Sequence, residues 1–178
     1  MDARFRALKT LKAGEFQHLN GDLESHLKAT ARILEKWGAP EILQTAGLFH
    51  AAYGTAGFSQ NMVSLNQRHS ISNIIGEKEE ELVYLYCACD RSFVFPQFGN
   101  NKRISFRDRF TESTFPLKDN DASMFCELTV ANELELVYSS DSFKFEHGEN
   151  LYKLFSRMEV FLPNAAVKAF KDAFAEFT

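Results

Sequence analysis

The chain has 178 residues, a formal net charge of −4 and three cysteines. This length suits one domain of average size with a core of its own, and a composition with 45% hydrophobic and 25% charged residues excludes a disordered chain. The mildly acidic balance argues against nucleic acid or an anionic membrane as the main partner.

The number of cysteines and the length of the apolar runs indicate the cellular compartment of the protein. Cys87, Cys89 and Cys126 are too few, and odd in number, for a secreted disulfide scaffold. The first 16 residues carry scattered charges without an apolar stretch, so no signal peptide is expected. The longest apolar run, residues 82–89, is far below the roughly 20 residues that cross a bilayer. We therefore expect a soluble, cytoplasmic protein whose cysteines are reduced and act as small apolar packing residues.

The first half of the chain predicts four helices. Leu23, Leu27 and Leu34 recur at helical spacing after a polar N-terminal signal, and Gly38 ends that pattern. Pro40 suits the first turn of a second helix, which we expect to run to Gly54. Two further helices are expected over residues 67–75 and 77–89, the last with glutamates at its start, where the helix dipole favours negative charge.

The second half begins with a change of pattern. Residues 93–106 are rich in Phe and carry a Gly-Asn-Asn turn signal, which favours a short β-hairpin or an irregular loop, and Pro96 keeps any strand at an edge. A long helix is then expected from Asp119 or Asp121 to about residue 138, followed by helices over 149–161 and 164–177. Since helix follows helix without strand alternation, we predict one all-α domain over residues 1–178.

Three polar residues stand where an apolar one is expected. His26, His50 and Asn132 lie on the inner faces of three different predicted helices. A buried polar group without a partner costs about 1–3 kcal/mol. We therefore expect these side chains to face one another, or a shared metal ion or ligand. The alternative is that each is a satisfied core residue.

The order His26, His50, Asn132 resembles the HD-domain superfamily of metal-dependent phosphohydrolases and related oxygenases. Residues 18–27, 37–40, 46–55 and 84–91 are similar to a small group of uncharacterised HD-like domains, and the resemblance covers about residues 15–140. It implies an HD-like helical bundle and a metal-binding pattern of His, then His-Asp, then a distant Asp.

The sequence departs from that pattern at two positions. Ala51 replaces the Asp of the His-Asp pair, and Asn132 stands near the place of the final Asp. The loss of two negative charges disfavours a two-metal hydrolytic centre. One divalent ion, Fe or Zn, held by His18, His26 and His50 is compatible with the residues present. A metal-free site in which the histidines bind an organic ligand is equally compatible.

Four further residues are candidates for the same site. Tyr53 follows His50 by one helical turn and adds a phenol, and Asp90 is placed to orient a histidine. Arg91 and Arg103 are candidate substrate-binding groups, because a guanidinium recognises carboxylate or phosphate in two-point fashion. Asn132 is expected on the substrate side. The alternatives are a core tyrosine, a helix-end arginine and a solvated basic loop over residues 102–109.

These residues together predict a small-molecule enzyme with His50, Tyr53 and Asp90 as catalytic groups. It acts by hydrolysis or oxidation on a small polar or anionic substrate, phosphorylated or carboxylated. The alternative is a catalytically degenerate HD-like domain that binds a metabolite or a protein partner. A third role is association of copies of the chain, a homo-oligomer, through the Phe-rich segment 93–115.

Overall fold

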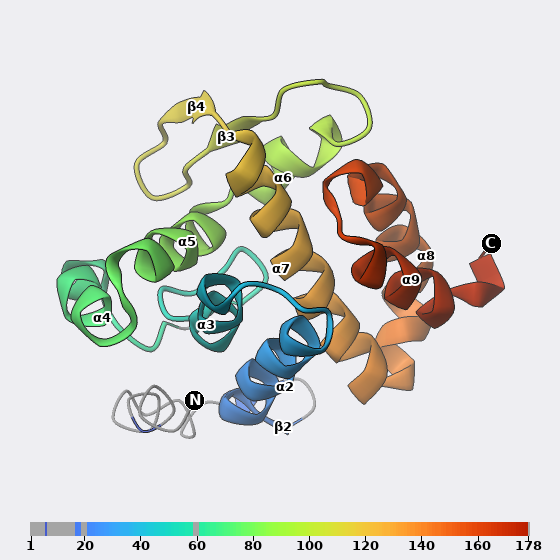
Figure 1. Ribbon diagram of the computed structural model, residues 1–178, viewed down its shortest axis with the longest axis horizontal. Coiled ribbons are helices and arrows are strands. Elements are labelled where there is room, and N and C mark those ends of the chain that lie inside the picture. Colours follow the sequence, from blue (N-terminus) through green and yellow to red (C-terminus); the bar gives the residue numbers. More distant parts are fainter. Residues whose placement is uncertain (1–5, 7–16, 19–20, 59–60, 178) are drawn as a thin grey trace. The chain divides into compact units, whose positions relative to one another are not determined.

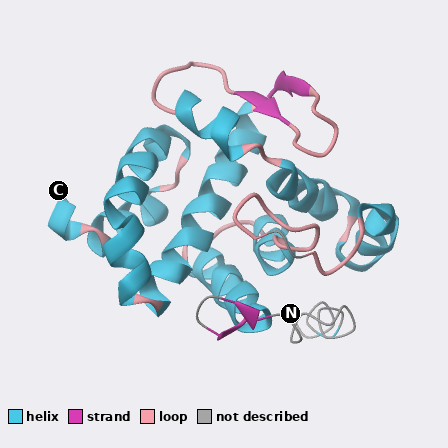
Figure 2. Ribbon diagram, turned by 180° about the vertical axis from the view of Figure 1, so that it is seen from behind, coloured by secondary structure: helices cyan, strands magenta, loops and turns pink. Residues whose placement is uncertain are grey.

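The computed structural model describes residues 6, 17–18, 21–58 and 61–177 (Figure 1). The chain is 71% helical, which confirms the predicted all-α class, and the strands are short (Figure 2). It divides into two compact units, Met1–Cys89 and Asp90–Thr178. The single domain over residues 1–178 stays a prediction. No helix among the described residues has the length and apolar character to cross a bilayer.

The first unit consists mainly of helices, with a longer connection over residues 50–64 after its second described helix. Its described elements are β1 (Gln17–His18), β2 (Gly21–Asp22), α2 (Leu23–Lys36), α3 (Glu41–Phe49), the 3-10 turn η2 (Leu65–Gln67), α4 (Arg68–Ile75) and α5 (Glu77–Ala88). The first two strands pair antiparallel. Helix α3 packs against α2 and also against α5. The four predicted helices are thus present in this unit.

Close packing of α2 against α3 depends on Gly47. A Cβ atom at this position would lie 2.6 Å from Cδ1 of Leu34 and 3.5 Å from Cα of Ala31, both on α2. Real Cβ atoms do not come as close as 2.6 Å, so a larger residue at this position would require the buried side chain of Leu34 to move. The small residue brings the end of α3 next to the middle of α2.

Helix α3 ends earlier than the sequence predicts. The helix stops at Phe49, and His50 is its C-terminal cap rather than a residue of its inner stripe. Nδ1 of His50 bonds the carbonyl oxygen of Gly47 at 2.7 Å. That oxygen is the acceptor that the amide of Ala51 would use in a continuing helix. Residues 50–54 therefore form turns, and Gly54, at φ +71°, follows the helix end instead of causing it.

The second unit is built on a long helix. Its elements are α6 (Arg91–Val94), η3 (Phe95–Gln97), β3 (Ser105–Arg107), β4 (Thr114–Pro116), α7 (Asp119–Ser139), α8 (Asp141–Met158), η4 (Glu159–Phe161), α9 (Asn164–Ala173) and η5 (Ala175–Phe177). Helix α7 packs against both α8 and α9. Phenylalanine rings pack against one another in this core, with Phe155 against Phe170 and Phe174 at 5.8 and 6.1 Å between centroids.

The hairpin forms, but mostly beyond the predicted residues 93–106. Asp90 caps α6 by accepting from the amide of Phe93, and Pro96 lies in the first turn of η3, a position that favours helical structure. The strands β3 and β4 pair antiparallel with Phe106 opposite Phe115. The Phe-rich start of this segment is therefore helical, and Pro96 is not at a strand edge.

Helix α8 begins eight residues before the predicted start at residue 149. Ser140 caps it by accepting from the amide of Phe143 at 3.2 Å. Residues 141–147 are exposed or half-buried, so this part of the helix has no buried face that would appear in the sequence as a periodic apolar pattern. Ser140 is both the cap and the only residue between α7 and α8, and it therefore defines where α8 begins.

Candidate functional site

A pair of histidines lies in the interior of the first unit. Nε2 of His26, on α2, is 3.2 Å from Nε2 of His50, at the end of α3. The ring centroids are 5.1 Å apart and the planes cross at 77°. The side chains are almost completely buried, with 5% and 2% of their residue surfaces exposed. Two of the three polar side chains expected to converge therefore do so.

The contacts of His50 fix which nitrogen carries its proton. Nδ1 lies 2.7 Å from the carbonyl oxygen of Gly47, which only accepts hydrogen bonds. Nδ1 therefore donates, and Nε2 of the neutral ring presents a lone pair. It follows that Nε2–H of His26 donates to Nε2 of His50. A backbone carbonyl that orients a histidine through the distal nitrogen is typical of metal-ligating histidines.

Helix α5 contacts the same histidine from another side. Sγ of Cys87 donates to the carbonyl oxygen of His50 at 3.1 Å. The ring of Tyr86 meets the His50 ring edge-on, with 5.5 Å between centroids. All three cysteines are free and buried, as expected, but the contact of Cys87 with His50 has no signal in the sequence.

Tyr53 points to a carboxylate on α5. Its phenol donates to Oε1 of Glu80 at 2.7 Å. Nε of Arg68 donates to the same oxygen at 2.7 Å, and Nη2 donates to Oε2 at 2.8 Å. The guanidinium also lies 3.7 Å above the ring of Tyr84, in cation–π geometry. We call Tyr53, Glu80 and Arg68 the Tyr53 triad.

Glu80 is the residue that sequence reasoning missed. It belongs to a run of glutamates at the start of α5, and it differs from its neighbours by its burial, at 4% exposed, and by its bonds to Tyr53 and Arg68. Burial, together with the bond to Glu80, raises the pKa of Tyr53 far above its usual range. The phenol is therefore a fixed hydrogen-bond donor, and its predicted catalytic role stays a prediction.

The pair by itself does not make up a metal-binding group among the described residues. Among the residues described, no three His, Cys, Asp or Glu side chains form a group that could hold a metal ion. His18 lies in β1, but its side chain falls outside the described part, so its predicted role as a ligand stays a prediction. Ala51, next to His50 in the chain, is buried.

A family model matches this part of the chain. Residues 7–91 match a Domain of unknown function (DUF6817). The matched region contains both histidines and the Tyr53 triad, and spans slightly less than half of the chain. No curated protein and no solved structure matches the sequence.

Two of the predicted residues, Arg91 and Asn132, share one carboxylate, whereas Asp90 bonds to other groups. Nη1 of Arg91 lies 3.0 Å from Oε1 of Glu133, and Nδ2 of Asn132 donates to the same oxygen at 3.2 Å. Asp90 accepts from the hydroxyl of Ser92 at 2.6 Å and from the amide of Phe93. These bonds lower the pKa of Asp90, with that from Ser92 contributing most. The roles of Asp90, Arg91 and Asn132 toward a substrate stay predictions.

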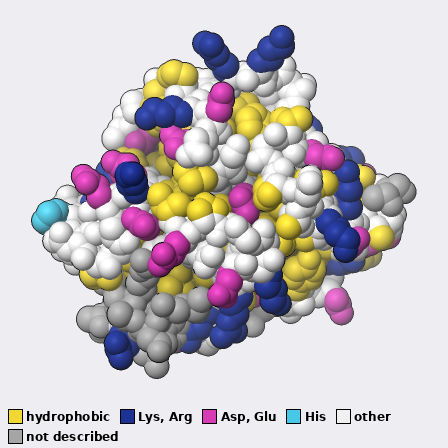
Figure 3. Space-filling model, viewed as in Figure 1, with side chains coloured by type: hydrophobic (Ala, Val, Ile, Leu, Met, Phe, Trp, Pro, Cys, Tyr) yellow, Lys and Arg dark blue, Asp and Glu magenta, His cyan; other side chains and the backbone are white. Residues whose placement is uncertain are grey.

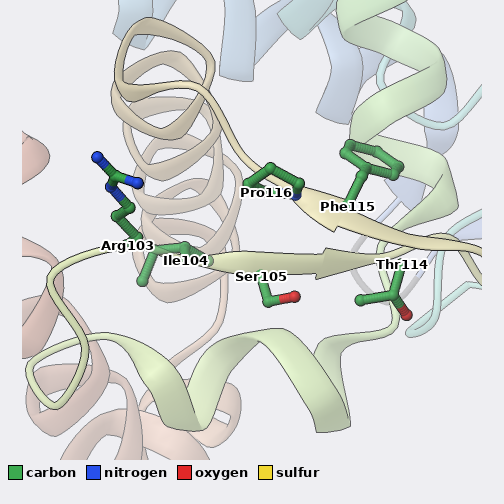
Figure 4. Close-up of a pocket in the computed structure, with 6 residues that line it drawn as sticks. All are labelled: Arg103, Ile104, Ser105, Thr114, Phe115 and Pro116. Carbon is green, nitrogen blue, oxygen red and sulfur yellow. The ribbon is translucent and has the colours of Figure 1, made fainter.

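Arg103 lies beside a shallow hollow at the hairpin (Figure 4). The hollow has a volume of about 220 Å³. It is lined by Arg103, Ile104, Ser105, Thr114, Phe115 and Pro116. Lys and Arg side chains project at the top of Figure 3, where Figure 1 places the hairpin and the loop before it. The predicted role of Arg103 in binding an anion is compatible with this exposed, basic position and stays a prediction.

A buried glutamate lies on α7 with an unsatisfied oxygen. Within the described part of the chain, Oε1 of Glu127 has no hydrogen-bond partner, and the residue is 8% exposed. Burial raises the pKa of this carboxyl to about 7. The residue did not stand out in the sequence, because glutamates at 127, 133 and 135 give the helix an ordinary mixed pattern.

Proposed function

We propose that the protein is a small-molecule enzyme of the HD-like type, with a single divalent metal ion, Fe or Zn, held by His26 and His50. The substrate is a small polar or anionic molecule, and the reaction is hydrolysis or oxidation. The observation that carries this proposal is the convergence of the two Nε2 atoms at 3.2 Å.

The distance between the two nitrogens fits a shared ion. Two imidazole nitrogens at about 2.0–2.1 Å from one tetrahedral ion are about 3.3–3.4 Å apart. The observed separation is 3.2 Å, so the two nitrogens already have the spacing that one ion needs. Binding an ion requires Nε2 of His26 to give up its proton and both lone pairs to turn from each other toward the ion. The bond from Nδ1 of His50 to Gly47 keeps the proton of His50 off Nε2, so that this nitrogen can bind an ion once the ion replaces the hydrogen bond from His26.

The residues at the site fit one ion rather than two. Ala51 supplies no carboxylate to bridge a second metal, and it is buried beside His50 in the chain. We propose His18 as the third ligand, since it precedes α2 by a few residues. Three histidines leave an open position for water or substrate, as in catalytic sites.

The chain's own groups have defined tasks in this proposal. His26 and His50 hold the ion, and the Gly47 carbonyl keeps His50 in the required tautomer. The bound ion supplies Lewis acidity or a water of lowered pKa. Burial of the pair keeps bulk water away, which strengthens electrostatic interactions at the site.

Ala51 favours a second candidate function. An HD-like domain without the Asp of the His-Asp pair is a candidate for a catalytically degenerate domain that binds a metabolite or a protein partner. In that case the hydrogen-bonded histidines are a satisfied polar pair in the core. Metal binding separates the two candidates.

The test measures metal content and turnover together. Purified protein is incubated with Fe(II), Zn(II), Co(II) or Mn(II), dialysed, and analysed for metal per chain. The loaded protein is then assayed with p-nitrophenyl phosphate, with bis(p-nitrophenyl) phosphate, and for oxygen consumption with small polyols.

We expect about one ion per chain, lost in the His26→Gln/His50→Gln variant. The matched control, His69→Gln, changes an exposed histidine of the same unit and should retain the metal. Protein that stays metal-free with all four ions would remove the metalloenzyme and leave the degenerate domain.

A further inference from the structure

We infer that the Tyr53 triad positions the imidazole of His50: by anchoring Tyr53 to α5, Glu80 and Arg68 hold the turn after α3 so that Nε2 of His50 faces His26. The geometric part of this inference concerns the histidine pair itself. Its consequence for metal affinity rests on the proposed function.

The turn needs external support, because it has left the helix. After Phe49, the backbone forms two short turns, from the amide of Ala52 to Phe49 and from that of Gly54 to Ala51, and the carbonyl oxygen of Ala52 accepts from the amides of Met62 and Val63. These bonds define the shape of residues 50–54, but they do not orient the segment relative to α2. Side-chain contacts with α5 supply that orientation.

Those contacts occur at both ends of the turn. At the start, Cys87 donates to the carbonyl oxygen of His50, and Tyr86 packs against its ring. At the other end, the phenol of Tyr53 donates to Glu80, two turns before Cys87 on the same helix. The turn therefore contacts α5 at two positions that are two helical turns apart. Tyr53 makes the contact that is farther from His50.

Glu80 is suited to this task by its own contacts. One oxygen accepts from both Tyr53 and Arg68, and the other accepts a second bond from Arg68. A carboxylate in a two-point ion pair has a restricted orientation, which defines where the phenol of Tyr53 must lie. Glu80 is nearly buried, whereas the side chain of Arg68 is 37% exposed. The guanidinium of Arg68 therefore neutralises the buried carboxylate of Glu80 from the solvent side.

The experiment observes the histidine pair directly in metal-free protein. In protein with 15N-labelled histidines, the hydrogen bond between the two Nε2 atoms gives a 15N–15N coupling. The Nδ1–H of His50 is detected separately in the same sample. The variants are Tyr53→Phe and Glu80→Gln, which keep the size of the side chain. The matched control is Glu81→Gln, an exposed glutamate next to Glu80 on α5.

We expect wild type and control to show the coupling, and both triad variants to lose it while their circular dichroism remains helical. Co(II) titration should give a dissociation constant 10–100-fold higher in the triad variants, the usual effect of changing a group that orients a ligand. The inference is overturned if both variants keep the coupling and bind Co(II) within twofold of the control.

A further variant separates positioning from stability. Arg68→Met/Glu80→Met replaces the ion pair with apolar side chains of similar size, an exchange that often preserves stability. We expect this protein to fold and still lose the coupling; a folded protein with an intact coupling would contradict the inference. If wild type shows the coupling but binds no metal, the proposed function fails while the positioning role is judged by the coupling alone.

Discussion

Nε2 of His26 and Nε2 of His50 lie 3.2 Å apart, although 24 residues separate them in the chain. The contact joins the first turn of α2 to the C-terminal cap of α3. It requires the close packing of these helices at Gly47 and the turn that α5 holds in place. Each of these supports can be changed separately.

Gly47→Ala should push the two helices apart. The new Cβ would lie 2.6 Å from Cδ1 of Leu34, which is fully buried and cannot move freely. Overpacking of this kind costs about 1–3 kcal/mol, and the better helix propensity of alanine offsets up to about 1 kcal/mol. We expect a net loss in the free energy of unfolding, measured by urea denaturation.

A double-mutant cycle checks the cause of this loss. In a Leu34→Ala background the clash is absent, so Gly47→Ala should become neutral or stabilising. Equal effects of Gly47→Ala in both backgrounds would show that contact with Leu34 is not the reason for glycine at this position.

Glu127→Gln should change how stability depends on pH. Burial raises the pKa of Glu127 from its ordinary 4.5 to about 7. Between these values the folded protein binds more protons than the unfolded chain, so the free energy of unfolding falls as pH rises. The variant lacks this loss and should be more stable than wild type by roughly 1–3 kcal/mol at pH 8.

At pH 4 both proteins bear a neutral side chain at position 127, and their stabilities should be similar. Chemical denaturation at pH 4, 6 and 8 measures the difference, with Glu81→Gln as an exposed control. A constant difference between wild type and Glu127→Gln across this range would show that Glu127 does not titrate as described.

Gln97→Ala should loosen the hairpin. The Gln97 amide accepts from the backbone N–H of Ser105 at 2.9 Å and donates to its carbonyl oxygen at 2.8 Å. It thereby covers the outer edge of β3, where a strand would otherwise pair. The loss of two such bonds should cost about 1–2 kcal/mol.

The local measurement is amide hydrogen exchange at Ser105. Its exchange should become faster in Gln97→Ala, while amides in the middle of α7 keep their protection relative to the global stability of the variant. Unchanged exchange at Ser105 would show that the Gln97 side chain does not protect this edge.

The sequence predicted structural features that depend on residues close together in the chain, such as the buried face of α2. The spacing of Leu23, Leu27 and Leu34 defines the buried face of α2, and the same periodicity puts His26 on that face. This is why the approach of His26 to His50 was predictable in outline, once both helices were expected to pack together.

Features that depend on distant contacts were not predictable in this way. Glu80 is distinguished from the other glutamates of α5 by Arg68 and Tyr53, which lie 12 and 27 residues away. Helix α3 ends where the ring of His50 bonds Gly47, while the sequence offered Gly54 as the plainer stop signal. Side-chain contacts determine which glutamate is buried and where the helix ends, and a local sequence pattern does not reveal these contacts.

The most direct test of a metal centre at the histidine pair is a crystal structure of protein soaked with Zn(II), with anomalous data collected on both sides of the zinc edge. We expect one peak within about 2.0–2.2 Å of both Nε2 atoms, with the Nδ1 bond of His50 to Gly47 intact. An intact Nε2–Nε2 hydrogen bond without an anomalous peak, or either ring turned away from the other, would contradict the proposal.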